Sequence, residues 1–213
     1  MLITISREYG AGGSEVARRV AAALGWRVVD NELVEQVAAR AGLPCEDVAL
    51  REERVPTFIE KLARTLVAAT PELFPPPGAA GTMAPLDEWA LVRVTETVVE
   101  EIAQQGRVVL VGRAAPAVLA RTQDALHVRL VAPKDDRIKT AANRLGCGLA
   151  EAASVLEETD RMRARYHQQH YHRDWRDPTN YHMVLNTSAL GFAGTAEVIV
   201  GRAESLGWGK GNK

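Results

Sequence analysis

The sequence predicts an α/β protein with a doubly wound sheet of five parallel strands. Two observations favour this fold class. Short apolar runs alternate with segments of helical periodicity along the chain, which is the pattern of βα units. The run Val108–Val111 is apolar at every position, as expected for a strand that is buried on both faces. In such a sheet the ligand crevice lies beyond the carboxyl ends of the strands.

The chain opens with one βαβ unit. Residues 2–5 form the first expected strand, and a glycine-rich turn follows it. Apolar residues then recur at helical spacing, namely Val16, Val20 and Leu24. Gly25 suits the C-cap of that helix, and the second strand is expected at residues 27–29.

A largely helical stretch is expected between the second and third strands. One helical pattern begins at Asp30–Asn31 and ends at Gly42, and another covers residues 56–70. Residues 71–85 are rich in proline and glycine and show no periodicity, so we expect a mobile surface loop there.

The second half of the chain alternates strands and helices. We place helices where apolar residues recur at helical spacing, and strands at the short apolar runs. In chain order, we expect a helix at residues 87–105, a strand at 108–111, a short helix ending at 121, a strand at 126–132, helices at 134–145 and 149–168, a strand at 183–186 and a helix at 193–206.

The glycine-rich turn between the first strand and the first helix is the most informative segment. Such a turn points backbone N–H groups and a helix N-terminus at one spot, which suits a phosphate. Compared with the frame GxxxxGK followed by Ser or Thr, the segment from Arg7 to Ser14 keeps the later glycine and the serine. Arg7 replaces the first glycine of the frame, and Gly13 replaces the lysine. A tight turn without a ligand is the alternative interpretation.

Several polar residues follow the expected strands, so the sheet would bring them to one edge. Asp30 follows the second strand, Arg113 the third and Arg137 the fourth. A guanidinium can hold a phosphate through two parallel hydrogen bonds. The alternatives are that Asp30 caps the following helix and that Arg113 is an ordinary surface residue.

The densest charge cluster begins at Asp160. Arg161 and Arg165 share a helix face, whereas Arg163 points elsewhere. Arginines on a closing segment can neutralise a phosphoryl group during its transfer. The alternative is a solvated helix face on which the arginines pair with neighbouring carboxylates. Histidines between 167 and 182 have no regular metal-ligand spacing, and we do not favour a metal site there.

The composition excludes several classes of function. The 213 residues are 46% hydrophobic and 25% charged, with a net charge of −1, so nothing in the overall charge favours nucleic acid or an anionic membrane. Cys45 and Cys147 are isolated, which fits a reducing compartment. No signal pattern or membrane-length apolar run is present. We therefore expect a cytoplasmic protein with small-molecule partners, and the sequence leaves its oligomeric state open.

The chain resembles the cytidylate kinase-like group of P-loop nucleoside monophosphate kinases. The resemblance spans almost the whole chain, in the blocks ISREYGAGGSEVA, AALGWRVVDNELV, VVLVGRAAPAVL, ALHVRLVAPKDDRI and DRMRARYHQQHYHRDWRDPTNYHMVLNTSAL. It implies a single P-loop kinase-like domain over residues 1–213, with a helical acceptor-binding region at 31–105 and a helical lid region at 134–181. It also implies transfer of the γ-phosphoryl group of ATP, with Mg²⁺, to CMP, dCMP or a related acceptor.

The resemblance also implies roles for individual residues. Ser14 would reach Mg²⁺, while Asp30 and Arg113 would face the acceptor. Arg161 and Arg165, together with Arg137, would close over the transferring phosphoryl group. The loop that holds the ATP phosphates would comprise Arg7, Gly10, Ala11, Gly12, Gly13 and Ser14.

Two departures from the family pattern keep alternatives open. Gly13 stands in the place of the P-loop lysine, and Ala114 stands where an acid follows the arginine in a GRD pattern. Arg7 or Arg18 would replace the lysine, and Arg7 is the better candidate because Arg18 lies a full turn into the helix. The other functions that fit are a nucleotide-binding module with weak or no catalysis and a kinase of a non-nucleotide small molecule.

Overall fold

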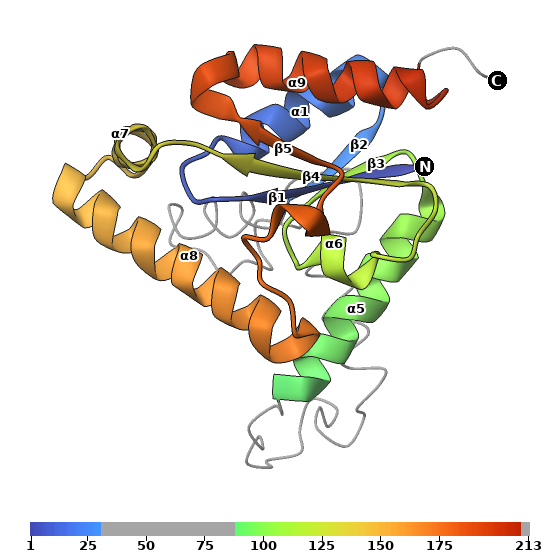
Figure 1. Ribbon diagram of the computed structural model, residues 1–213, viewed down its shortest axis with the longest axis horizontal. Coiled ribbons are helices and arrows are strands. Elements are labelled where there is room, and N and C mark those ends of the chain that lie inside the picture. Colours follow the sequence, from blue (N-terminus) through green and yellow to red (C-terminus); the bar gives the residue numbers. More distant parts are fainter. Residues whose placement is uncertain (31–87, 210–213) are drawn as a thin grey trace, which may run out of the picture. The chain divides into compact units, whose positions relative to one another are not determined.

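A computed structural model describes residues 1–30 and 88–209, and the chain divides into two compact units (Figure 1). One unit comprises residues 1–30 and 105–213. The other comprises residues 31–104, and its described element is helix α5 (Glu88–Gln105). The helices expected from Asn31 and over 56–70, the loop expected at 71–85, and Cys45 lie outside the described residues.

The first unit is built on one parallel sheet of five strands in the order β2-β3-β1-β4-β5. The strands are β1 (Leu2–Arg7), β2 (Arg27–Asp30), β3 (Val108–Val111), β4 (Ala125–Val131) and β5 (Met183–Asn186). Ile5 of β1 is in register with Val111 of β3 and with Val128 of β4. The carboxyl ends of the central strands therefore meet at one edge, and the predicted fold class is confirmed.

Helices cover both faces of the sheet (Figure 1). The helices α1 (Gly13–Leu24) and α9 (Thr187–Ser205) lie on one face. The helices α6 (Ala115–Val118) and α8 (Leu149–Tyr171) lie on the other. Helix α7 (Lys134–Leu145) leaves the carboxyl end of β4 and packs against α8, and a 3₁₀ turn at Pro178–Asn180 precedes β5.

The two faces of the central strands differ in chemistry. On the α1/α9 face the side chains are apolar and buried, among them Ile3, Ile5, Val109, Val128, Leu130, Val16, Val20 and Ile199. Alternate residues of a strand point to opposite faces, so Thr4, Ser6, His127 and Arg129 occupy the other face. All four are buried, at 4% exposure or less. The second face is therefore a polar interior that must supply its own hydrogen-bond partners.

Three elements are longer than the sequence predicts. Strand β1 continues to Arg7, and α8 continues to Tyr171, where left-handed His172 (φ 52°) is the C-cap. Helix α9 begins at Thr187 and not at residue 193, because the Asn186 side chain accepts hydrogen bonds from the backbone N–H groups of residues 188 and 189. The non-helical Gly191 interrupts α9 shortly afterwards, and this break hid the first turn from a search for periodicity.

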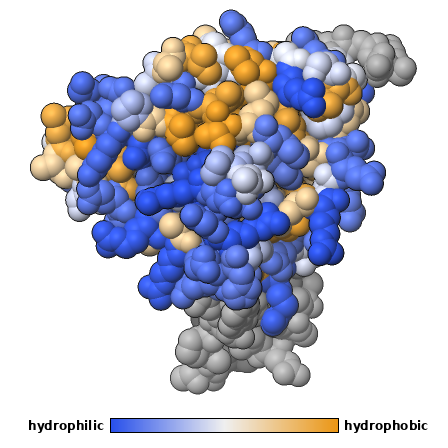
Figure 2. All heavy atoms as spheres, in the orientation of Figure 1, coloured by the Kyte–Doolittle hydropathy of each residue, from blue (hydrophilic) through white to orange (hydrophobic). Residues whose placement is uncertain are grey.

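Exposed apolar side chains gather over part of the surface in Figure 2. Exposed large apolar side chains occur on β5 and α9, namely Val184, Leu190 and Val198, and beside the α7–α8 turn, namely Leu145 and Leu149. Within the described ranges, every helix is too short or too polar to cross a lipid bilayer.

Candidate functional site

The glycine-rich loop joins the end of β1 to the start of α1 at the carboxyl edge of the sheet. Gly10 (φ 81°) and Gly12 (φ 76°) are both left-handed, a conformation that suits glycine. A Cβ at Gly10 would lie 2.4 Å from the carbonyl oxygen of Arg137, and a Cβ at Gly12 would lie 2.3 Å from the Phe192 ring. The loop is therefore packed closely between α7 and α9. Because α1 begins directly after Gly12, its first backbone N–H groups have no partner within the helix.

Arg7, the last residue of β1, lies against this loop. Its Cγ would be 2.7 Å from a Cβ at Gly13, and its Nη1 would be 2.4 Å from a Cβ at Gly112. The side chain is buried, with 9% exposure. Arg18 instead contacts Glu15 on the exposed side of α1. Of the two arginines considered from the sequence, Arg7 is the one at the loop.

The backbone of the loop is held by side chains from α7 and α8. The Asp160 Oδ1 accepts a hydrogen bond from the Tyr9 backbone N–H at 2.8 Å, and its Oδ2 accepts one from Arg137 Nη1 at 2.7 Å. Arg137 also donates to the Tyr9 carbonyl at 3.2 Å, and Arg163 donates to the Arg7 carbonyl at 3.0 Å. Asp160 and Arg137 are both buried. These contacts define the conformation of the loop before any ligand binds.

A second set of contacts connects the loop to the segment after α8. Glu8 lies 3.4 Å from the Arg129 guanidinium and 3.3 Å from that of Arg137. Arg129 is 2% exposed, donates to the Trp175 carbonyl at 2.9 Å and stacks 4.2 Å from the centre of the Trp175 ring. The Trp175 indole in turn donates to Ser6 Oγ at 2.8 Å. The segment that follows α8 is thereby attached to the strand that precedes the loop.

Asp30 and Arg113 lie at the same edge of the sheet. Asp30 is in register with Val111, two residues before Arg113, and its carboxyl group is mostly buried. Gly112, Arg113 and Ala114 are consecutive left-handed residues, with φ of 80°, 53° and 50°. Each non-glycine residue in this conformation costs about 1 to 2 kcal/mol, and such strain is concentrated at functional sites.

The sequence matches the model of the cytidylate kinase-like family over residues 2–189. The chain belongs to the cytidylate kinase-like family. A solved structure of an uncharacterized protein from Eubacterium ventriosum ATCC 27560 is similar to it, with a TM-score of 0.64, 19% identity and coverage of 96% of this chain and 99% of that one. Shikimate kinase from Bacteroides thetaiotaomicron has a TM-score of 0.50 and 16% identity, with coverage of 97% of both chains. At these identities the likeness concerns the P-loop kinase fold. No curated protein matches the chain.

The arginines that the family resemblance assigns to phosphoryl transfer are placed differently from one another. Arg137 is buried against Asp160. Arg161 pairs with Glu158 at 2.7 Å and its side chain is 69% exposed, while Arg165 donates to Gln169 at 3.2 Å on the same helix. The face of α8 that meets the loop carries Asp160 and Arg163, and not Arg161 and Arg165.

Sequence reasoning missed the structural roles of Arg129, Asp160 and Arg163. A signal for each is present in the sequence. His127 and Arg129 alternate with apolar residues in β4, so they share one face of a strand. Asp160 and Arg163 continue the buried helix stripe that starts at Ala152 and Leu156. The partners across the fold are distant in sequence, however, and no spacing rule predicts them.

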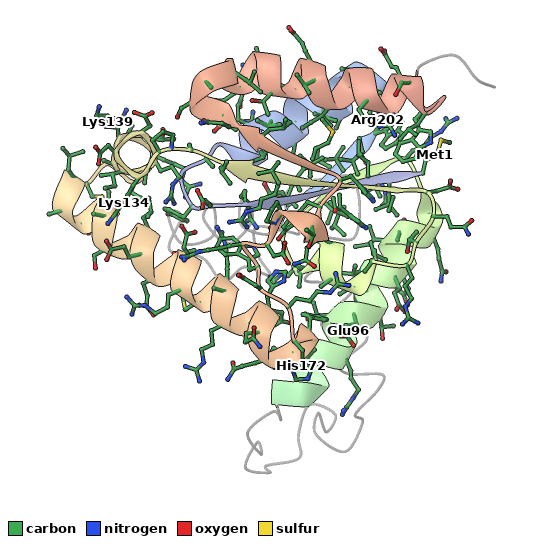
Figure 3. All side chains as sticks on the ribbon, in the orientation of Figure 1. Met1, Glu96, Lys134, Lys139, His172 and Arg202 are labelled. Atoms are coloured by element: carbon green, nitrogen blue, oxygen red, sulfur yellow. The ribbon has the colours of Figure 1, made fainter. Side chains whose placement is uncertain are left out.

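One cavity adjoins the loop, and a second lies along α8. One of about 240 Å³ lies beside Gly10, between α7 and the start of α9, and is lined by Asp136, Thr140, Ser188 and Phe192 among others. The other, of about 480 Å³, lies along α8 and contains charges of both signs. At its rim Lys134, labelled in Figure 3, contacts Glu157 at 2.5 Å. The second cavity already contains the ion pair between Lys134 and Glu157.

Two buried histidines have strongly altered proton affinities. Burial, followed by the charge of His182, lowers the pKa of His127 to about 4. Burial, followed by the charges of Arg129 and Arg173, lowers the pKa of His167 to about 4. Both are therefore neutral at pH 7. Within residues 1–30 and 88–209, no group of three or more histidine, cysteine, aspartate or glutamate side chains could hold a metal ion.

Proposed function

We propose that this protein transfers the γ-phosphoryl group of ATP to a small-molecule acceptor, with a nucleoside monophosphate of the CMP or dCMP type as the first choice. The observation that carries the proposal is the glycine-rich loop at the carboxyl edge of the sheet, in a chain of the cytidylate kinase-like family. Backbone N–H groups and a helix N-terminus together bind phosphate well. The family and the loop chemistry therefore support the same type of reaction.

The loop from Gly10 to Ser14 would hold the ATP phosphates. Its two left-handed glycines let the backbone turn tightly from β1 into α1, so the N–H groups at the start of α1 are left for phosphate oxygens. Ser14 is the second residue of α1 and offers a hydroxyl oxygen, which fits a Mg²⁺ ion that keeps most of its coordination for phosphates and water. The ion would neutralise charge on the phosphates.

The cavity beside Gly10 would hold the base of ATP. Its volume of about 240 Å³ lies below the range of about 300 to 1,000 Å³ of most small-molecule sites, so it would take the base and not the whole nucleotide. Phe192 offers an apolar wall, while Ser188 and Thr140 offer hydroxyl groups. A base seated there would direct the ribose and the phosphates toward Gly10.

In the proposed reaction an oxygen of the acceptor phosphate attacks the γ-phosphorus. The new P–O bond forms as the bond from that phosphorus to the β,γ-bridging oxygen breaks, and ADP leaves with the bridging oxygen. Little covalent work is required of the protein, which aligns the reactants and neutralises charge. Asp30 and Arg113 would face the acceptor, since both lie at the edge of the sheet beside the loop.

Arg161 and Arg165 would join the site through closure of the region 134–181 over bound nucleotide. Both make their contacts along α8, at exposed positions. Arg137 would act mainly through the backbone of the loop, because its guanidinium is bonded to Asp160 and to the Tyr9 carbonyl. We propose a single kinase-like domain over residues 1–213, with residues 31–105 as its acceptor-binding region.

A second candidate function is a nucleotide-binding module without turnover. The observation that favours it is Gly13, which stands where the phosphate-binding frame has a lysine. A kinase of a non-nucleotide acceptor would share the ATP site and differ around Asp30 and Arg113.

An assay of acceptor-dependent ADP formation tests these alternatives. The purified protein is incubated with ATP, Mg²⁺ and, one at a time, CMP, dCMP, UMP, AMP, GMP and shikimate, and the phosphorylated product is identified by mass spectrometry. ADP and CDP formation that depends on CMP supports the proposal, and a product from shikimate alone supports the third function. Saturable binding of ATP in calorimetry without any product supports the binding module. Absence of ATP binding excludes all three.

A further inference from the structure

We infer that Arg7 and Gly13 form a reciprocal exchange, in which residue 7 delivers the phosphate-binding cation that residue 13 lacks. This inference rests on the proposed function, because it assigns Arg7 to the phosphates of bound nucleotide. In the frame GxxxxGK followed by Ser or Thr, this chain departs at its first and seventh positions. Residue 7 has gained a cation where the frame has glycine, and residue 13 has lost one.

The structure brings these two departures into contact. A Cβ at Gly13 would lie 2.7 Å from Cγ, 3.2 Å from Cδ and 3.3 Å from Cβ of Arg7. The stem of Arg7 therefore fills the space in which a side chain at residue 13 would begin. A lysine at residue 13 is compatible with a glycine at residue 7, and Arg7 is compatible with a glycine at residue 13. The presence of Arg7 therefore requires a residue without a side chain at position 13, so the two departures depend on each other.

The head of Arg7 lies where a phosphate cation is needed. From the end of β1 the side chain passes the first residue of α1 and reaches Gly112, just beyond β3. Its Nη1 would be 2.4 Å from a Cβ at Gly112, whose φ is 80°. The guanidinium thus lies at the carboxyl edge of the sheet, beside the helix N-terminus that would bind the phosphates. Glycine at residue 112 makes room for it, just as Gly13 makes room for the stem.

The position of Arg7 is set before ligand binds. Its carbonyl oxygen accepts a hydrogen bond from Arg163 at 3.0 Å, its strand is paired on both sides, and its side chain is 9% exposed. A guanidinium can donate two parallel hydrogen bonds to two phosphate oxygens. It would neutralise charge on the transferring phosphoryl group, the task of the lysine in the usual frame.

The exchange is tested with four proteins: the unaltered chain, Arg7→Gly, Gly13→Lys and the double variant. The double variant regenerates the full frame, Gly-Glu-Tyr-Gly-Ala-Gly-Lys-Ser. Binding of Mg·ATP is measured by calorimetry, with Arg18→Ala as the control for loss of an exposed arginine near the loop. We expect Arg7→Gly to weaken binding at least tenfold, Gly13→Lys to weaken it as well, and the double variant to recover most of the loss. Unchanged binding by Arg7→Gly, or a double variant that is no better than the worse single variant, overturns the inference.

A stability measurement covers the case in which Gly13→Lys does not fold. Gly13→Ala is compared in the unaltered chain and in an Arg7→Ala background by thermal unfolding. We expect it to lower the Tm when Arg7 is present and to raise the Tm when Arg7 is absent, because alanine is then a better helix residue than glycine. Equal changes in the two backgrounds overturn the steric exchange. If the unaltered chain itself does not bind Mg·ATP, the proposed function fails and the cationic role of Arg7 fails with it, whereas loss of the Arg7 effect alone leaves the proposed function standing.

Discussion

Asp160 accepts a hydrogen bond from the backbone N–H of Tyr9 at 2.8 Å, across 151 positions of sequence. One buried carboxylate on α8 thereby holds the backbone of the glycine-rich loop, while its other oxygen holds the buried Arg137 guanidinium. A charge in the interior is tolerated when it is paired and hydrogen-bonded. Movement of α8 must therefore act directly on the loop.

Replacement of Asp160 by asparagine should strongly destabilise the protein. The amide keeps the shape of the side chain but removes the charge that compensates buried Arg137. We expect a loss of about 3 to 5 kcal/mol in the free energy of unfolding, measured by denaturant titration. Glu158→Gln is the control, because it removes an exposed carboxylate from the same helix and should change stability by less than about 1 kcal/mol. Equal effects of the two variants would contradict the role of Asp160.

Gly10→Ala should cost much more stability than Gly146→Ala. Both glycines are left-handed, with φ of 81° and 67°, but a Cβ at Gly146 would meet no atom within 4 Å. Gly146→Ala therefore measures the backbone strain alone, about 1 to 2 kcal/mol. Gly10→Ala adds a contact of 2.4 Å with the Arg137 carbonyl, so we expect a total of about 3 kcal/mol or more. Similar thermal unfolding of the two variants would show that the loop is not closely packed against α7.

Local patterns in the sequence predicted much of the fold. The strand at 108–111, the helix at 134–145 and the strand at 183–186 have the bounds expected of them. The helix at 134–145 stands between Pro133 and Gly146, so both of its ends are marked by local chemistry. The start of α9 was missed because one side chain, Asn186, caps it before any apolar repeat begins.

The candidate site could be predicted only in part. The loop was found because all of its residues are contiguous in sequence. The contacts that hold the loop were not found, because Arg129 and Asp160 meet it through tertiary packing. The sequence also did not predict that the Arg7 side chain packs against Gly13, because this contact depends on the direction of that side chain at the end of β1.

The hydrogen bond between Trp175 and Ser6 should be measurable in a double-mutant cycle. Trp175→Phe keeps an aromatic ring beside Arg129 but removes the indole N–H, which donates to Ser6 Oγ at 2.8 Å in a buried setting. We expect Trp175→Phe and Ser6→Ala to be coupled by about 1 kcal/mol in unfolding free energy. The pair Trp175→Phe and Thr97→Ala is the control, because Thr97 is exposed and bonds to the backbone carbonyl of Arg93 in its own helix. Additive effects for Ser6 and Trp175 would show that this bond contributes nothing to stability.

His127 and His182 form a stacked pair, with ring centres 4.9 Å apart and planes inclined by 12°. His182 Nδ1 accepts a hydrogen bond from the backbone N–H of His127 at 2.9 Å, so this nitrogen carries no proton. His127 Nδ1 lies 2.8 Å from the Thr4 hydroxyl. A positive charge on the His127 ring would be buried and would lie directly against the His182 ring, which is why burial lowers the pKa of His127.

Stability should therefore fall as the pH is lowered from about 6.5 toward 4. Burial lowers the pKa of folded His127 from its ordinary value of 6.5 to about 4, so in this interval the unfolded chain takes up a proton that the folded protein does not. The stabilisation is complete above about pH 6.5, declines by about 1.4 kcal/mol per pH unit for this one group, and stops declining below about pH 4. His127→Gln, whose amide can still bond to Thr4, should show a shallower decline in denaturant titrations. His172→Asn, at the exposed end of α8 labelled in Figure 3, should keep the original slope, since asparagine accepts the left-handed backbone there. An unchanged slope in His127→Gln would mean that protonation of His127 does not cause the loss of stability. His167, whose pKa is also lowered by burial, would then be the next residue to replace.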